Sequence, residues 1–105
     1  MTPSAVFEDL KSRIAERPEL VDEIGAIYQF NVDGEDGGSW IVDLSSAPGE
    51  VRSGEDDNAD CIITMGEQDF VGIMTGAVDP QMAFMMGRIK VAGNFMLATK
   101  LRALI

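Results

Sequence analysis

The side chains of this chain that are capable of acid–base or metal chemistry gather in one acidic segment. Asp56, Asp57 and Asp60 stand close together, and carboxylates of this kind act as general acids or bind calcium. Their spacing is not that of a regular calcium loop, and no glycine-rich phosphate loop or metal-ligand cluster stands nearby. We therefore interpret these acids as solvated charge in a turn, and a hydrolytic or metal-dependent enzyme is the less favoured hypothesis.

Other reactive side chains are scarce. The sequence has no histidine, which removes the commonest general base and the commonest metal ligand. Cys61 is the single cysteine and stands in an apolar run, so it forms no intrachain disulfide and is expected to be a buried, inert thiol. These features predict a protein that is not an enzyme, with no catalytic residue, no metal site and no cofactor.

A second concentration of side chains is apolar. Four of the seven methionines lie between residues 82 and 96, and Phe84 and Phe95 stand in the same stretch. Because methionine is flexible and polarisable, a wall rich in methionine adapts to ligands of different shape. The same pattern is compatible with gap-filling in a small core and with a surface that binds a partner helix, so the pattern alone leaves these alternatives open.

Charge is distributed unevenly along the chain. The first 60 residues hold 15 of the 18 acids and four bases, whereas no acid follows Asp79. We predict transient contact with an anionic membrane or headgroup through the bases that remain, with solvated surface charge as the alternative. The net charge of −10 argues against nucleic acid as a partner. The bases after Asp79 are Arg88, Lys90, Lys100 and Arg102.

Capping signals and hydrophobic periodicity predict the elements that position these residues. Helices are predicted from Thr2-Pro3 to about Arg17, from Pro18 to Gly25, from a capping box of Thr64 and Glu67 to Gly76, from Asp79-Pro80 to Met86, and, after a cap at Asn94, from Phe95 to Ile105. Alternating segments predict strands at 26–32, 40–45, 50–53, 61–65 and 88–92, with 50–53 at a sheet edge and 61–65 in the sheet interior. The order predicts one α+β domain over residues 1–105, with helices against one face of a five-stranded sheet.

Several sequence motifs occur in a fixed order from Trp40 onward. They are Trp40-Ile41-Val42-Asp43-Leu44, Ala59-Asp60-Cys61-Ile62-Ile63-Thr64-Met65, Met74-Thr75-Gly76, Asp79-Pro80-Gln81-Met82-Ala83-Phe84, Gly87-Arg88-Ile89-Lys90-Val91-Ala92-Gly93-Asn94 and Ala98-x-Lys100-Leu101. In order and spacing they resemble the SCP-2 sterol-transfer family. The resemblance extends less strongly to the front of the chain, where Phe7, Pro18 and Tyr28-x-Phe30 occupy the expected places.

The resemblance implies a mixed five-stranded sheet covered by helices that enclose a hydrophobic tunnel, closed by the terminal helix. It also implies non-enzymatic binding and transfer of sterol-like lipids, fatty acids, fatty acyl-CoA or phospholipids. The competing hypothesis is a methionine-rich protein-interaction module with no lipid ligand. The residues expected to contact the lipid, with Gln81 as a polar group near the mouth, are Trp40, Ile73, Gln81, Met82, Phe84, Met85, Phe95, Met96, Leu101 and Leu104.

The sequence also predicts a cytoplasmic location. Its apolar runs are far shorter than the roughly 20 residues of a membrane span, and Met1-Thr2-Pro3 does not open a signal peptide. Eukaryotic members of the family often end in a peroxisomal targeting tripeptide, whereas this chain ends in Ala103-Leu104-Ile105. We therefore expect a free-standing cytoplasmic protein.

Overall fold

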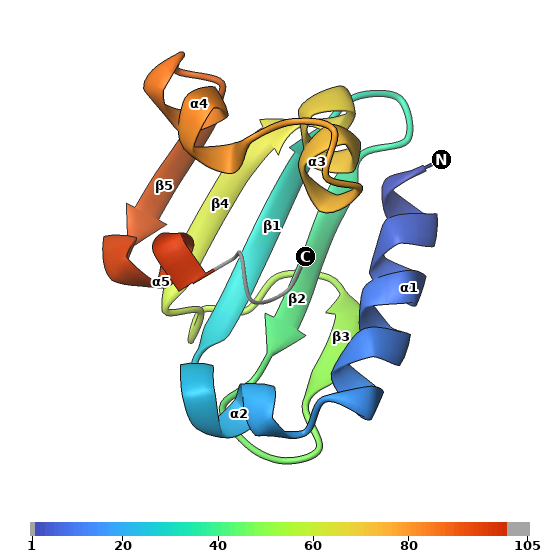
Figure 1. Cartoon of the computed structure of the whole chain (residues 1–105), viewed down its shortest axis with the longest axis vertical. Coiled ribbons are helices and arrows are strands. Elements are labelled where there is room, and N and C mark those ends of the chain that lie inside the picture. Colours follow the sequence, from blue (N-terminus) through green and yellow to red (C-terminus); the bar gives the residue numbers. More distant parts are fainter. Residues whose placement is uncertain (1, 101–105) are drawn as a thin grey trace.

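The computed structural model describes residues 2–100, and its helices and strands follow the predicted order (Figure 1). No helix within residues 2–100 is both long enough and apolar enough to cross a membrane. The elements are α1 (Pro3–Glu16), α2 (Glu19–Ile24), β1 (Ile27–Asp33), β2 (Gly38–Asp43), β3 (Glu50–Ser53), β4 (Cys61–Gly66), α3 (Glu67–Met74), α4 (Pro80–Met85), β5 (Ile89–Gly93) and α5 (Phe95–Thr99).

The strands form one mixed sheet in the order β3-β2-β1-β4-β5. The β1 and β4 strands are parallel, and the other three neighbouring pairs are antiparallel. In the parallel pair Tyr28 lies opposite Cys61 and Phe30 lies opposite Ile63. The predictions that β3 lies at an edge and β4 in the interior are confirmed, as is the α+β class with a mixed five-stranded sheet.

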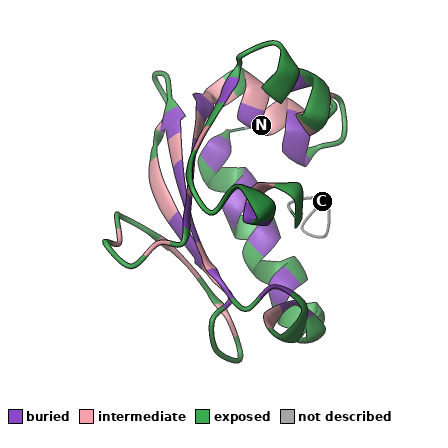
Figure 2. Ribbon diagram, turned by 90° about the vertical axis from the view of Figure 1, so that its left-hand side faces the viewer, coloured by how far each residue is buried: buried purple, intermediate pink, exposed green. Residues whose placement is uncertain are grey.

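The described helices cover one face of the sheet, and the core lies between the two layers (Figure 2). α1 contributes its buried stripe of Val6, Phe7, Leu10 and Ile14, which share one helix face because of their spacing. The Phe7 ring stacks on Phe70 of α3, with ring centroids 4.8 Å apart. This cluster fills the end of the molecule near α1 and leaves the β5 end to α4 and α5 (Figure 1).

Most of the predicted helix signals are confirmed. The Ala5 amide donates to Thr2 Oγ1 at 3.2 Å, the Gln81 amide to Asp79 Oδ1 at 2.9 Å, and the Met96 amide to Asn94 Oδ1 at 3.0 Å. In α5 the described helix runs to Thr99 with Lys100 as its C-cap, and residues 101–105 of the predicted helix lie outside the described residues.

The capping box predicted at Thr64 is wrong. Thr64 belongs to β4, where it pairs with Asn31 and Lys90, and its backbone is therefore extended. Gly66 precedes α3 without a side-chain cap. The carboxylate of Glu67 accepts a hydrogen bond from the Asp36 amide at 3.3 Å instead, so it stabilises the turn between β1 and β2.

Two sets of hydrogen bonds fix α5 over the sheet. At its middle, the buried Tyr28 hydroxyl of β1 donates to the Leu97 carbonyl at 2.6 Å. At its beginning, the Asn94 amide donates to the Asp60 carbonyl at 2.8 Å, while the Asp60 carboxylate accepts from the Ile27 amide at 2.9 Å. The first turn of α5 is thus tied to both β1 and the segment that enters β4.

Gly93 permits this close approach. Its φ is 85°, and a Cβ at this position would lie 2.5 Å from the Asp60 carbonyl oxygen. Gly87 provides a contrast, because its φ is 76° but a Cβ there would meet no atom within 4 Å. Both glycines satisfy a left-handed backbone, whereas only Gly93 also makes room for a neighbouring carbonyl.

We predict that Gly93→Ala is more destabilising than Gly87→Ala. The left-handed conformation alone costs Gly87→Ala about 1–2 kcal/mol, and the additional clash brings Gly93→Ala to roughly 3 kcal/mol. Urea denaturation of both variants measures the difference. Equal losses of unfolding free energy would show that the contact with Asp60 is not a constraint.

We predict that Tyr28→Phe lowers the unfolding free energy by about 0.5–1.5 kcal/mol, because it removes one buried hydrogen bond to the Leu97 carbonyl, which then keeps only the Lys100 amide as a donor. Thr75→Val is the matched control, since the exposed Thr75 hydroxyl donates to the Val71 carbonyl at 2.7 Å. The control is expected to change stability by no more than about 0.5 kcal/mol. Denaturation curves measure both variants. If the curves of Tyr28→Phe and Thr75→Val coincide, the role given to Tyr28 is contradicted.

Candidate functional site

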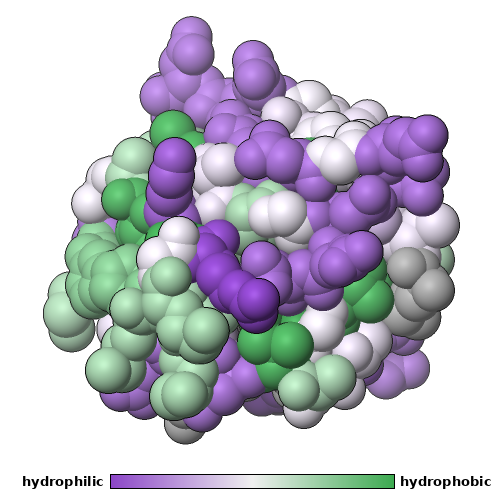
Figure 3. Space-filling model, turned by 90° about the horizontal axis from the view of Figure 1, so that it is seen from above, coloured by the Kyte–Doolittle hydropathy of each residue, from purple (hydrophilic) through white to green (hydrophobic). Residues whose placement is uncertain are grey.

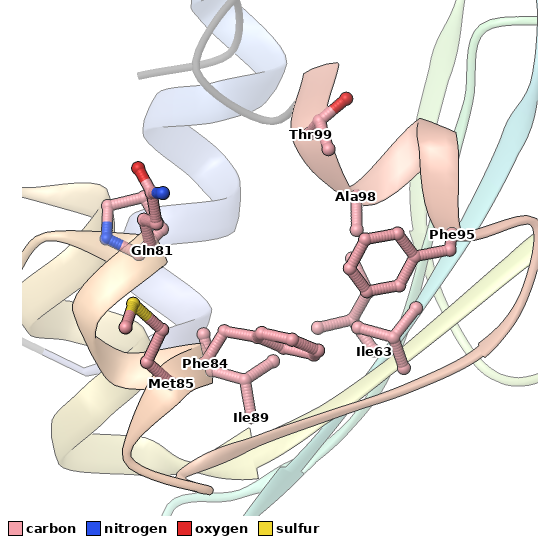
Figure 4. Close-up of a pocket in the computed structure, with 10 residues that line it drawn as sticks. Ile63, Gln81, Phe84, Met85, Ile89, Phe95, Ala98 and Thr99 are labelled. Atoms are coloured by element: carbon pink, nitrogen blue, oxygen red, sulfur yellow. The ribbon is translucent and has the colours of Figure 1, made fainter.

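A pocket of about 420 Å³ lies between α4, α5 and the inner face of β4 and β5 (Figure 4). None of the described residues that line it has a titratable side chain. They are Ile63, Pro80, Gln81, Phe84, Met85, Ile89, Val91, Phe95, Ala98 and Thr99.

The floor of the pocket follows from strand alternation. Ile89 and Val91 stand two positions apart on β5, so their side chains point to the same face of the sheet. Val91 pairs with Ile63 of β4, which places a third branched side chain beside them. The floor is therefore rigid and apolar.

The walls come from the two short helices. Asp79 caps α4 at the point where Pro80 begins it, and Asn94 caps α5 in the same way before Phe95. The rings of Phe84 and Phe95 meet edge to face, with centroids 5.1 Å apart and planes at 63°. This aromatic pair joins the two walls over the floor.

The pocket opens to the surface. Met85 is 74% exposed and Phe95 is 50% exposed, although both line it. Gln81 and Thr99 bring amide and hydroxyl groups from opposite walls (Figure 4). The Thr99 hydroxyl donates to the Met96 carbonyl at 2.6 Å, whereas no other described residue binds the Gln81 side-chain amide. Such a pocket accommodates an apolar molecule and offers a few uncharged polar groups for its orientation.

Of the residues expected to contact a lipid, four line this pocket, and their role as ligand contacts stays a prediction. Trp40 and Ile73 lie elsewhere: Trp40 stacks on Phe7 with centroids 4.6 Å apart, and Ile73 is buried in the core. Met82 and Met96 are exposed outside the lining, and Leu101 and Leu104 lie outside the described residues. The four that line the pocket are Gln81, Phe84, Met85 and Phe95.

Six further residues that line the pocket were not predicted from the sequence. The alternation of the last predicted strand is a signal that would have placed Ile89 and Val91 on one face. Ile63 becomes a neighbour only through the pairing of β4 with β5, and no local pattern reveals that register. The other three, Pro80, Ala98 and Thr99, are unremarkable residues of α4 and α5.

Asp56 of the acidic segment stabilises the turn in which it lies. Asp56 accepts from the Asn58 amide at 2.8 Å and from Arg52 Nη2 at 2.7 Å, and its own amide donates to Gln29 Oε1. The Asn58 amide, and secondarily Arg52, lower the pKa of the Asp56 carboxyl. Within residues 2–100, no group of acids, cysteine and histidine is arranged to hold a metal ion.

Cys61 and Tyr28 are buried opposite each other on the central strands. Burial, with a smaller effect of Asp60, raises the pKa of the Cys61 thiol to about 11. Burial also raises the pKa of the Tyr28 hydroxyl, with the Cys61 charge as the second cause. Both groups therefore stay neutral at physiological pH, and the thiol is a poor nucleophile there.

Comparison with known sequences agrees with the motifs. Residues 7–105 match the SCP-2 sterol transfer family. The chain is 47% identical over 88 residues to hydroxysteroid dehydrogenase-like protein 2 of Rattus norvegicus, covering 83% of this chain and 17% of the relative. It is 41% identical over 103 residues to sterol carrier protein 2 of Homo sapiens, covering 94% and 19% respectively. The chain thus spans less than a fifth of the length of these curated relatives.

Comparison with solved structures supports the fold. Palmitated SCP2L2 from Aedes aegypti superposes with a TM-score of 0.82 at 25% identity, covering 99% of this chain and 95% of that one. The apo form of sterol carrier protein 2 from Yarrowia lipolytica gives a TM-score of 0.79 at 28% identity, with coverage of 95% and 84%. Together with the matched family and the sequence relatives, these likenesses establish that the chain belongs to the SCP-2 sterol transfer family.

Proposed function

We propose that this chain binds a lipid in the pocket between α4 and α5 and transfers it without chemical change. The observation that carries the proposal is the pocket itself, about 420 Å³ of apolar space whose described lining has no titratable group. Membership of the family and the palmitated state of the Aedes aegypti relative support it. The candidate ligands remain sterol-like lipids, fatty acids, fatty acyl-CoA and phospholipids.

The pocket supplies enough binding free energy for a carrier. Burial of a methylene group contributes about 0.8 kcal/mol, so an acyl chain of about 16 carbons offers on the order of 13 kcal/mol before ordering costs. Micromolar affinity needs only about 8 kcal/mol. Incomplete insertion of an acyl chain therefore still gives useful affinity and permits release.

The polar groups at the mouth favour a particular orientation. The Gln81 side-chain amide, which no other described residue binds, can donate or accept a hydrogen bond, and it stands across the pocket from Thr99 (Figure 4). We propose that the apolar tail lies over Ile63 and Val91 while the ligand's carboxyl, ester or hydroxyl group remains near Gln81. A charged headgroup would then stay in water and avoid the cost of burial.

The alternatives differ in what the pocket holds. One relative carries a dehydrogenase-like name, but this chain matches only 17% of its length. We propose that the portion represented here is non-catalytic and acts in the cytoplasm. A methionine-rich protein-interaction module is the second candidate, favoured by the exposed methionines of α4. It requires no internal ligand.

Native mass spectrometry of freshly purified protein, followed by organic extraction, tests the proposal. A carrier is expected to show an added mass of lipid size and to release a lipid that can be identified. Protein that is free of lipid and takes up no fluorescent fatty acid would contradict a carrier and favour the interaction module.

We predict that Ala98→Trp weakens the binding of a fluorescent fatty acid at least tenfold, a loss of about 1.4 kcal/mol, because the indole fills pocket space. Ala92→Trp is the matched control: Ala92 is exposed on β5, and alternation with Val91 turns its side chain away from the pocket. Fluorescence titration measures both variants, with thermal unfolding to confirm that they fold. Equal affinities for the two folded variants would place the ligand elsewhere.

A further inference from the structure

The described methionines fall into two groups that differ in their access to solvent. Met65 and Met74 are buried in the core. Figure 3 shows a hydrophobic area at the α4 side of the molecule, set in an otherwise largely polar view. Because oxidation of sulfur follows exposure, only the methionines outside the core are open to an oxidant. They lie on α4, at its C-cap and on α5, and their exposed fractions are 55% for Met82, 74% for Met85, 63% for Met86 and 66% for Met96.

Met85 differs from the other three exposed methionines in its position. It lines the pocket, whereas Met82, Met86 and Met96 do not. It is also the most exposed of the four. Its side chain therefore faces both solvent and pocket, so an oxidant reaches its sulfur from outside and a lipid in the pocket contacts the same side chain.

The neighbour of Met85 on the α4 wall is Gln81. The two residues stand four positions apart on α4, so their side chains are neighbours on the helix surface. Figure 4 shows both on the same wall of the pocket. The Gln81 side-chain amide, which no other described residue binds, offers two N–H donors. A thioether is a weak acceptor for such a donor, whereas a sulfoxide is polar and carries an oxygen.

We propose that Met85 is a modification site, and that its oxidation to the sulfoxide by a peroxide weakens lipid binding in the pocket. The inference rests on the proposed lipid carriage. The sulfoxide oxygen makes the α4 wall polar, and a lipid that covers this oxygen removes it from water at a cost in free energy. The same oxygen accepts from the Gln81 amide, which then no longer orients the polar group of the ligand.

The modification transfers one oxygen atom from the peroxide to Met85. The thioether sulfur attacks one oxygen of hydrogen peroxide, so that the S–O bond forms as the O–O bond breaks. The sulfur is oxidised by two electrons and the peroxide is reduced. The proton on the transferred oxygen passes through solvent to the leaving hydroxide, which departs as water. This step needs no protein base, and the described lining of the pocket has none.

The single cysteine does not compete for the oxidant. Cys61 is fully buried on β4, and burial raises the pKa of its thiol to about 11. The thiolate that reacts with peroxide is therefore scarce at physiological pH. Methionine sulfoxide is also reduced again by dedicated reductases, one for each epimer, so the modification of Met85 is reversible.

Treatment of the purified protein with hydrogen peroxide tests the proposal. Peptide mass spectrometry follows the added oxygen at each methionine, and titration with a fluorescent fatty acid follows affinity. Met85 is expected to be oxidised before Met65 and Met74, and affinity is expected to fall at least fivefold, since burial of a polar group is unfavourable. The two methionine sulfoxide reductases together are expected to restore it. Unchanged affinity of protein that is fully oxidised at Met85 would overturn the proposal.

Two leucine variants identify the methionine that acts. Met85→Leu removes the sulfur and keeps an apolar side chain of similar volume. Met86→Leu makes the same change one position later, outside the pocket lining. Each variant is compared with itself before and after peroxide, with thermal unfolding to confirm that it folds. Met85→Leu is expected to keep its own affinity after treatment, and Met86→Leu to lose affinity as the wild type does. Equal losses in both would overturn the role of Met85.

Protection by a bound lipid provides an independent test. Saturating fluorescent fatty acid is expected to slow the oxidation of Met85 at least fivefold and to leave the rate at Met86 unchanged, because the ligand covers only the lining. Equal rates at Met85 with and without the fatty acid would contradict the proposal. Wild-type protein that binds no fatty acid before treatment would contradict the carrier and the modification site together. Normal binding that is insensitive to oxidation of Met85 would contradict the modification site alone.

Discussion

The pocket depends on α5 being fixed at a set height over the sheet. The Tyr28 hydroxyl reaches up from β1 to the Leu97 carbonyl at 2.6 Å, and Asp60 holds the beginning of the helix through the Asn94 amide. α5 contributes Phe95, Ala98 and Thr99 to the lining, so its height determines the space beneath it. A hydrogen bond holds its two heavy atoms within a narrow range of distance, so this bond limits how far α5 can move from β1.

Local sequence signals predicted the helices and strands, whereas the residues of the pocket also depend on how the strands pair across the sheet. Thr2, Asp79 and Asn94 could be predicted as caps because a short polar side chain before a helix has few other uses. Thr64 failed for the opposite reason, since its strand pairs on both sides and extends its backbone. Phe84 and Met85 could be predicted as lining because the family resemblance was added to an apolar pattern that by itself also fitted a core or a partner surface. Ile63 could not, because its place beside Val91 follows from a register that no local pattern contains.

The family resemblance predicted the fold and the role, whereas it did not predict which apolar residues line the pocket. The family motifs predicted the sheet and a lipid-binding role, but they could not tell which apolar residues the core would use. Ile73 packs inward because α3 covers the centre of the sheet, and Trp40 is occupied by its stack on Phe7.

The order of the elements also has a consequence for how the chain folds. The parallel pairing of β1 with β4 bridges a long separation, with Ile27 bonded to Asp60 33 positions later. Such non-local contacts form slowly because a long loop must close first. Apart from Ile63, every described residue of the pocket lies after both strands, between residues 80 and 99. During synthesis from the N-terminus, β1 to β4 are therefore made before most of the pocket lining, and the binding site is assembled on strands that already exist.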